Sequence, residues 1–179
     1  MYGKIDIISV GDQGSRLTTG VICRNQPPHL SYLHSLKYLN TVYFCNMMEL
    51  TNDITIICVT ADSFPEGILP AFEKLHKQLS GNRKSYGISR PGKNGTIIYK
   101  AGAEELSEGE VPDLERFILK KGTYISMDVL DFMNNIPAIG KAFEQLLADP
   151  RIDPEGACVE WYFNEKDVKC MIRIIQSQI

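Results

Sequence analysis

The clearest alternation of apolar and polar positions lies near the end of the chain, where residues 156–175 predict a β-hairpin. Successive side chains of a strand point to opposite faces. In the first strand, one face carries Cys158, Glu160 and Tyr162, and the other carries Val159, Trp161 and Phe163. Both faces are largely apolar, which predicts a sheet that is covered, at least in part, on each side.

Glu160 is the one acid in this strand. A buried carboxylate is costly unless another group pairs with it. Two interpretations stay open from the pattern alone. Glu160 is either a sheet-surface residue matched by a basic residue across the strands, for which Arg173 is available, or a pocket acid that awaits a cationic or proton-accepting ligand.

The pattern from residue 48 to residue 150 predicts a clear order of strands and helices. Residues 48–61 are rich in β-formers, and a helix is expected from about 63 to 79, with its regular part starting close to Pro70. Residues 85–91 and 96–105 predict two strands joined by a turn at 92–95. One or two strands follow within 109–130. A second helix within 134–150 has Pro137 in its first turn.

Residues 1–46 have the weakest pattern. Residues 4–10 and 20–25 are candidate strands, and a short helix is expected within 25–40, after a Pro-Pro break. This segment is either an added edge hairpin with a helix or a poorly defined N-terminal extension. We favour the extension, with the main domain running from residue 47 to residue 179.

An internal repeat indicates the architecture. AFEKL at 71–75 recurs as AFEQL at 142–146, an offset of 142 − 71 = 71. The same offset pairs 53–64 with 124–135 and 85–91 with 156–162 without gaps, giving repeats at about 48–104 and 114–176. Ala-Phe-Glu-x-Leu could also recur by chance on an amphipathic helix. Duplication predicts an α+β fold, in which two β-α-β-β units form one antiparallel sheet with both helices on one face and a central ligand groove.

Composition narrows the function classes. A net charge of −3 over 179 residues argues against nucleic-acid binding. The five cysteines have no CxxC spacing, which favours buried free thiols over disulfides, and no His/Cys spacing suits a metal. The sequence has neither an apolar run long enough to span a membrane nor a secretory signal, so we expect a cytoplasmic location. We expect no cofactor.

Three segments, 86–104, 119–131 and 159–174, together resemble the GyrI-like family. This family includes the effector-binding domains of AraC-type and MerR-type multidrug regulators and stand-alone gyrase inhibitory proteins. The resemblance covers about 48–175 and implies two fused β-α-β-β units around an aromatic-lined groove. A glutamate on the family's penultimate strand often contacts lipophilic cations. Glu160 matches it, and Tyr162 matches an aromatic residue two positions later.

Further residues are candidates for the wall of such a groove: Tyr124, Tyr86, Tyr99, Trp161 and Phe132. Ordinary core packing is the alternative for each, and we favour it for Trp161 and Phe132. Tyr124 is the stronger candidate, since a buried hydroxyl needs a polar partner.

The family's regulators carry a DNA-binding domain, and no segment of this sequence predicts one. The leading hypothesis is therefore a stand-alone protein that binds lipophilic or cationic small molecules. An alternative is a hydrolase of electrophilic cyclopropane-type toxins, with Glu160 as general base. A third is a gyrase-inhibitor-like module that binds DNA gyrase or a regulator through the acidic residues of 104–110.

Overall fold

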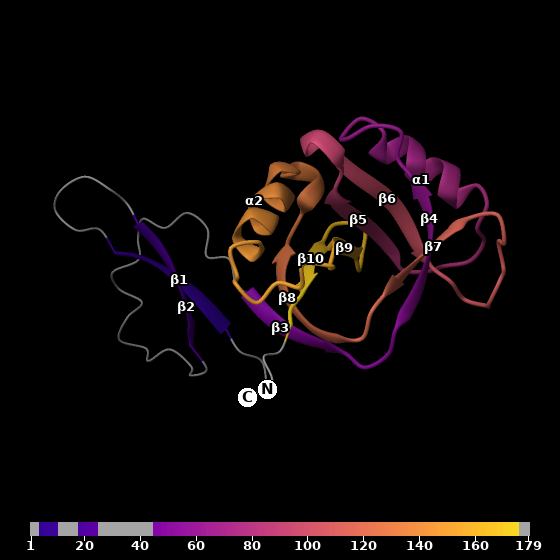
Figure 1. The fold of residues 1–179 in the computed structure, drawn as a ribbon. Helices are drawn as coiled ribbons and strands as arrows, with labels where there is room; N and C mark the ends of the chain where they lie inside the picture. Colours follow the sequence, from indigo (N-terminus) through magenta and orange to yellow (C-terminus); the bar gives the residue numbers. More distant parts are fainter. Residues whose placement is uncertain (1–3, 11–17, 25–44, 176–179) are drawn as a thin grey trace.

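The computed structural model of the protein describes residues 4–10, 18–24 and 45–175 (Figure 1). The elements follow in the order β1 (Lys4–Val10), β2 (Thr18–Arg24), β3 (Cys45–Leu50), β4 (Ile54–Thr60), α1 (Ile68–His76), β5 (Ser85–Pro91), β6 (Ile97–Glu104), β7 (Glu115–Leu119), β8 (Gly122–Val129), α2 (Pro137–Leu146), β9 (Cys158–Tyr162) and β10 (Val168–Arg173). Two 3₁₀ turns, η2 (Lys93–Gly95) and η3 (Phe132–Asn134), precede β6 and α2.

The predicted fold class is confirmed. The strands form one sheet in the order β2-β1-β3-β8-β10-β9-β5-β6-β4-β7, and every pair is antiparallel. The sheet is curled, and α1 and α2 lie over different parts of it, α1 against β4 and β6 and α2 against β8 and β10 (Figure 1). The order β4-α1-β5-β6 recurs as β8-α2-β9-β10, and the two halves meet where β5 pairs with β9.

The strand that precedes each half joins the other half. β3 comes before β4 in the chain but pairs with β8, and β7 comes before β8 but pairs with β4. β3 begins at Cys45, so it crosses position 47, where the sequence places the start of the main domain. β1 and β2 form a hairpin beside β3. The helix expected within 25–40 lies outside the described residues.

One detail of the repeat differs from the gapless offset. In the first half, Ala103 pairs with Ile57. The counterpart of Ala103 in the second half is Ile174, since 103 + 71 = 174, and the Ile174 N–H donates a hydrogen bond to the Thr123 carbonyl. The offset between the first strands is therefore 123 − 57 = 66. The offset of 71 applies to the helices and the last two strands, because helix similarity does not determine how the first strand pairs with its neighbour.

Alternation along the strands divides the core between the two faces. Under α1 lies the α1 cluster, formed by Ile57, Val59, Ala71, Leu75, Ala101 and Ala103. Under α2 lies the larger α2 cluster, formed by residues that include Ile125, Met127, Ala142, Phe143, Leu146 and Ile172. The opposite face of the sheet carries the far-face cluster, which includes Ile56, Cys58, Tyr86, Ile88, Leu119, Tyr124 and Val159.

Both helices are positioned by their apolar stripes. Ala71 and Leu75 on α1 are buried, and so are their counterparts Ala142 and Leu146 on α2. Burying one leucine side chain stabilises a fold by about 2 kcal/mol, so these contacts hold each helix on the sheet. Neither helix in the described part of the chain is long and apolar enough to cross a membrane.

Candidate functional site

Glu160 lies in the middle of the sheet, next to the line where the halves meet. On β9 it pairs with Gly87 of β5 on one side and with Cys170 of β10 on the other. Its side chain is on the face that carries the helices, and only 8% of the residue is exposed. The structure thus places a carboxylate between the α1 and α2 clusters, in a region largely removed from water.

Two tyrosine hydroxyls bind this carboxylate. The Tyr99 hydroxyl of β6 donates to Glu160 Oε2 at 2.8 Å, and the Tyr162 hydroxyl donates to the same oxygen. The two hydroxyl oxygens lie 3.4 Å apart. Among the described residues, no donor reaches Oε1 and no basic side chain lies within ion-pair distance of Glu160.

The interpretation in which Arg173 pairs with Glu160 is wrong. Arg173 Nη1 lies 2.9 Å from Asp153 Oδ2, and on β10 it is Cys170 that lies across from Glu160. The two side chains also lie on opposite faces of the sheet. Cys170 and Ile172 face α2 on the side of Tyr162 and Glu160, so Arg173, the next residue of β10, faces the other way. The buried acid is therefore held by neutral hydroxyls and not by a cation.

Gly87 makes the space for this arrangement. A Cβ atom at position 87 would lie 2.0 Å from the Tyr99 hydroxyl oxygen and 2.5 Å from Glu160 Oε2. Such distances are far below contact distance, so a side chain here would force both groups to move. The absence of a side chain on β5 lets the Tyr99 hydroxyl cross that strand to reach the acid on β9.

Burial is the main influence on the protonation of these groups. It raises the pKa of Glu160, against the opposing effect of the hydrogen bonds from Tyr162 and Tyr99. Burial, together with the nearby Glu160 charge, also raises the pKa values of Tyr99 and Tyr162, so both stay protonated donors. A positive group beside the carboxylate would stabilise its charged form further.

Phenylalanine rings surround this polar centre. Phe72 of α1 meets the Tyr162 ring edge-on at 5.8 Å between centroids, and Phe132 lies 5.4 Å from the same ring. Phe64, before α1, lies 5.8 Å from the Tyr99 ring and is 41% exposed. These residues, Glu160, Tyr99, Tyr162, Phe64, Phe72 and Phe132, are called the Glu160 cluster below.

The predicted site residues divide between the two faces of the sheet. The structure brings Glu160, Tyr162, Tyr99 and Phe132 together. Tyr86, Tyr124 and Trp161 belong to the far-face cluster or pack against it. Tyr86 pairs with Trp161 across β5 and β9, one position away from Gly87 and Glu160, and so on the opposite face. The Tyr124 hydroxyl donates to the Lys120 carbonyl at 2.6 Å.

Sequence reasoning missed Phe64, Phe72 and Gly87. Phe72 lies inside the repeated AFEKL segment, and its contact with Tyr162 depends on how α1 packs on the sheet. Phe64 comes directly before Pro65, where the sequence predicts the entry of a helix and no ring contact. Gly87 offered one signal, as an isolated glycine inside a strand, which often marks close approach.

The described cysteines Cys58, Cys158 and Cys170 are free thiols. Burial is the largest cause that raises the pKa of Cys158 to about 11, and it raises that of Cys170 as well, so both are neutral next to Glu160. In residues 45–175, no group of His, Cys, Asp and Glu side chains is arranged to hold a metal ion.

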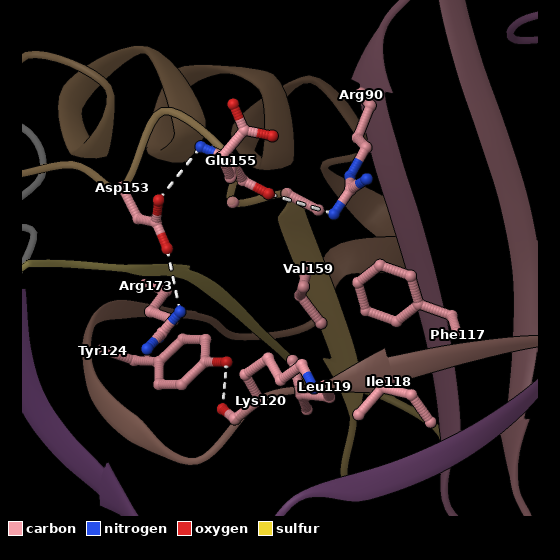
Figure 2. A pocket seen from close by; sticks show the side chains of 12 residues that line it. Arg90, Phe117, Ile118, Leu119, Lys120, Tyr124, Asp153, Glu155, Val159 and Arg173 are labelled. Atoms are coloured by element: carbon pink, nitrogen blue, oxygen red, sulfur yellow. Dashed lines mark hydrogen bonds and ion pairs between the residues drawn. The ribbon is translucent and has the colours of Figure 1, made fainter.

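A separate hollow lies on the far face of the sheet (Figure 2). Its lining comes from β5, β7, the β7–β8 connection, β8, β9, β10 and the segment before β9: Arg90, Phe117, Ile118, Leu119, Lys120, Tyr124, Asp153, Glu155, Gly156, Ala157, Val159 and Arg173. Because Val159 and Glu160 are consecutive on β9, this hollow and the Glu160 cluster occupy opposite faces of the same strand.

Comparison with known proteins identifies the fold. No protein-family model matches the sequence, and no protein with a curated description matches it. The integron cassette protein VCH_CASS2 from Vibrio cholerae has a similar structure, with a TM-score of 0.53 and 16% identity over 73% of this chain and 95% of its own. SAV2435, solved bound to tetraphenylphosphonium, has a TM-score of 0.51 and 11% identity over 72% of this chain and 92% of its own. At these identities the likeness concerns the fold alone.

Proposed function

We propose that the protein binds small lipophilic cations against the carboxylate of Glu160. The observation that carries the proposal is a buried acid with both of its neutral donors on one oxygen and no cation of the described chain in reach. The other oxygen is left for a ligand. An acid kept in this state lowers the stability of the empty protein, and a bound cation would remove that cost.

The surroundings of Glu160 would select ligands by their charge more than by their shape. Two unit charges attract each other several-fold more strongly near a protein interior than in water, because the local dielectric constant is lower. The faces of Phe64, Phe72 and Phe132 add cation–π attraction and apolar contact without directional demands. A site of this kind would accept cations of varied outline and reject anions of the same outline.

Phe64 is the place where a ligand would reach the cluster. Its ring contacts Tyr99, yet 41% of the residue is exposed, whereas Glu160 behind it is 8% exposed. A rotation of this one side chain would open a route to Tyr99 and Glu160 without disturbing the α1 cluster. The cation would then lie between the phenylalanine rings, with its charge directed at Oε1.

The comparisons support the same class of ligand. SAV2435, which shares the fold, was solved with tetraphenylphosphonium, a lipophilic cation. The resemblance to the GyrI-like family also implies cation contact by a glutamate at the position of Glu160. We propose that this chain belongs with that group as a binding domain and acts by capture of the ligand.

Calorimetric titration of the full chain with tetraphenylphosphonium tests the proposal. Wild type should bind, and Glu160→Gln should weaken binding by roughly ten- to hundred-fold, because a contact to a charged group contributes about 1.5–3 kcal/mol. The substitution retains the outline of the side chain and its acceptor oxygen, so a loss of affinity would report the charge.

Two controls make the result specific. Glu144→Gln removes the same charge from an exposed position on α2 and should leave the affinity unchanged. Tetraphenylborate has the outline of tetraphenylphosphonium with the opposite charge and should not bind to wild type. Equal affinity of wild type and Glu160→Gln for tetraphenylphosphonium would refute the proposal.

A further inference from the structure

The hollow on the far face has an apolar floor. Leu119, Tyr124 and Val159 line it, and each of them is at most 2% exposed. Phe117 of β7 forms a side wall, and Figure 2 shows its ring and the Val159 side chain facing the same open space. A floor of this kind removes apolar ligand surface from water, which is the general source of affinity in small-molecule sites.

Arg90 stands at the rim with hydrogen-bonding capacity left over. Its guanidinium carbon lies 5.2 Å from the Phe117 ring centroid, and Nη2 donates to the Glu155 carbonyl at 3.1 Å. Among the described residues, no carboxylate lies within ion-pair distance of Arg90. A guanidinium has five N–H donors, so several remain for a ligand.

The acidic groups at the rim are already engaged or turned away. Asp153 Oδ2 accepts from Arg173 Nη1 at 2.9 Å, and Asp153 Oδ1 accepts from the Glu155 N–H at 3.0 Å. The Glu155 carboxylate points away from the hollow (Figure 2). Arg173 keeps a buried Nε without an acceptor in the described part of the chain. The charge that faces the hollow is therefore positive.

We propose that this hollow is a second binding site, which takes a small organic anion with an apolar body, such as an aromatic carboxylate. The carboxylate would lie on Arg90, whose planar fork suits two parallel hydrogen bonds. The ring would lie against Phe117, Leu119 and Val159. The two faces of the sheet would thus select ligands of opposite charge.

1-Naphthoate is the probe for this site, and the Leu119 and Val159 methyl groups report where it binds. In the full chain, these methyl NMR signals should shift on titration, because a naphthalene ring changes the field around groups that it touches. Arg90→Gln should weaken binding at least ten-fold, the loss expected for a contact to a charged group of about 1.5 kcal/mol. Arg90→Lys keeps the charge but lacks the planar fork, so its affinity for 1-naphthoate should lie between those of wild type and Arg90→Gln.

The matched controls separate this site from general charge effects and from the Glu160 cluster. Lys74→Gln removes one positive charge from an exposed position on α1, and Glu160→Gln alters the other face; both should bind 1-naphthoate as wild type does. 1-Naphthylmethylammonium, a cation of similar outline, should not shift the Leu119 methyl groups. The proposal is overturned if Arg90→Gln, with an unchanged far-UV spectrum, binds 1-naphthoate as wild type does, or if the two methyl signals stay unmoved. Should Arg90→Gln fail to fold, an unchanged affinity in Arg90→Lys would overturn it instead.

Discussion

The two halves of the sheet contain the same elements but differ where they meet. At the offset of 71, Gly87 corresponds to Cys158 and Ser89 corresponds to Glu160, so the pair Gly87–Glu160 is the counterpart of the pair Ser89–Cys158. Both pairs lie on β5 and β9 and face the helices. One pair holds an acid beside an empty position, and the other holds a hydroxyl beside a thiol.

The donors follow the same asymmetry. Tyr99 corresponds to Cys170, and Tyr162 corresponds to Pro91, so the position of Ser89 has no equivalent pair of hydroxyl donors. The equivalent position around Ser89 is thus completed without an acid, a tyrosine pair or a glycine beside it. The architecture does not require Glu160, which supports a functional reason for its presence.

The largest expected effect comes from two phenylalanines at equivalent helix positions, Phe72 on α1 and Phe143 on α2, where 72 + 71 = 143. Phe143 belongs to the α2 cluster and is 9% exposed, whereas Phe72 is half-buried and faces Tyr162. Phe143→Ala should lower the free energy of unfolding by about 3–5 kcal/mol, and Phe72→Ala by well under that amount.

Urea unfolding of both variants measures the difference in stability, and titration with tetraphenylphosphonium measures its functional counterpart. Phe72→Ala should lose affinity for the cation in spite of its smaller loss of stability, because its ring borders the Glu160 cluster. If both variants lose the same stability and Phe72→Ala binds normally, the two positions have the same structural role and the distinction between the halves fails.

Gly87→Ala is expected to have the next largest effect. The added methyl group would collide with the Tyr99 hydroxyl and Glu160 Oε2, and overpacking of this kind costs about 1–3 kcal/mol. Gly140→Ala is the matched control, since outside the neighbouring residues and the α2 backbone no atom lies within 4 Å of the added Cβ. That variant should gain about 0.5–1 kcal/mol from helix propensity. Thermal unfolding of both variants compares them, and a stable Gly87→Ala would contradict the described contact.

The periodicity of apolar residues and the Gly and Pro residues at boundaries were enough to predict most of the helices and strands. The β9–β10 hairpin, both helices and the turn before β6 follow from alternation, from apolar stripes, and from Gly and Pro at the boundaries. Gly95 in that turn has φ of +76°, a conformation that glycine adopts without strain. The shift of five residues between the first strands was not predictable, because it depends on cross-strand pairing that no local pattern encodes.

The candidate site was predictable at its centre and not at its edge. Glu160 stands out as an acid in an apolar strand, and Tyr162 lies on its face by alternation. The same alternation places Trp161 on the opposite face. Phe64 and Phe72 come near Tyr99 and Tyr162 only because α1 packs onto β4 and β6, which is a tertiary contact.

The pH dependence of stability should reveal the cost of the buried acid. Burial raises the pKa of Glu160 above its ordinary value of 4.5, so the folded state binds the proton more tightly than the unfolded chain does. The stability linked to Glu160 is complete below about pH 4.5 and is lost as the pH rises through the raised pKa. Glu160→Gln lacks this loss, so it should be more stable than wild type at neutral pH, by about 1–2 kcal/mol.

Chemical denaturation at several pH values between about 4 and 8 checks this sign. The difference between wild type and Glu160→Gln should shrink to zero at the acidic end and grow with pH. Ser89 at the equivalent position provides the comparison, because Ser89→Ala removes no titrating group and should show no such pH trend. A Glu160→Gln variant that is less stable than wild type at neutral pH would mean that the ionised acid is stabilised in the empty protein.

The smallest expected effect concerns the donor that crosses between the halves. Tyr99→Phe removes one of the two hydrogen bonds to Glu160 Oε2 and retains the ring that packs on Phe64, so it should lower the stability by about 1 kcal/mol at neutral pH. The loss should become smaller in acid, where Glu160 is protonated and needs the donor less. Tyr86→Phe, on the far face, removes a hydroxyl that does not reach Glu160, and it should show no such pH trend. Guanidinium unfolding of both variants at neutral and acidic pH measures the effect. If Tyr99→Phe and Tyr86→Phe show the same loss of stability and the same pH trend, the hydrogen bond from Tyr162 is sufficient for Glu160. Tyr99 of the first half would then not contribute to the stability of the acid.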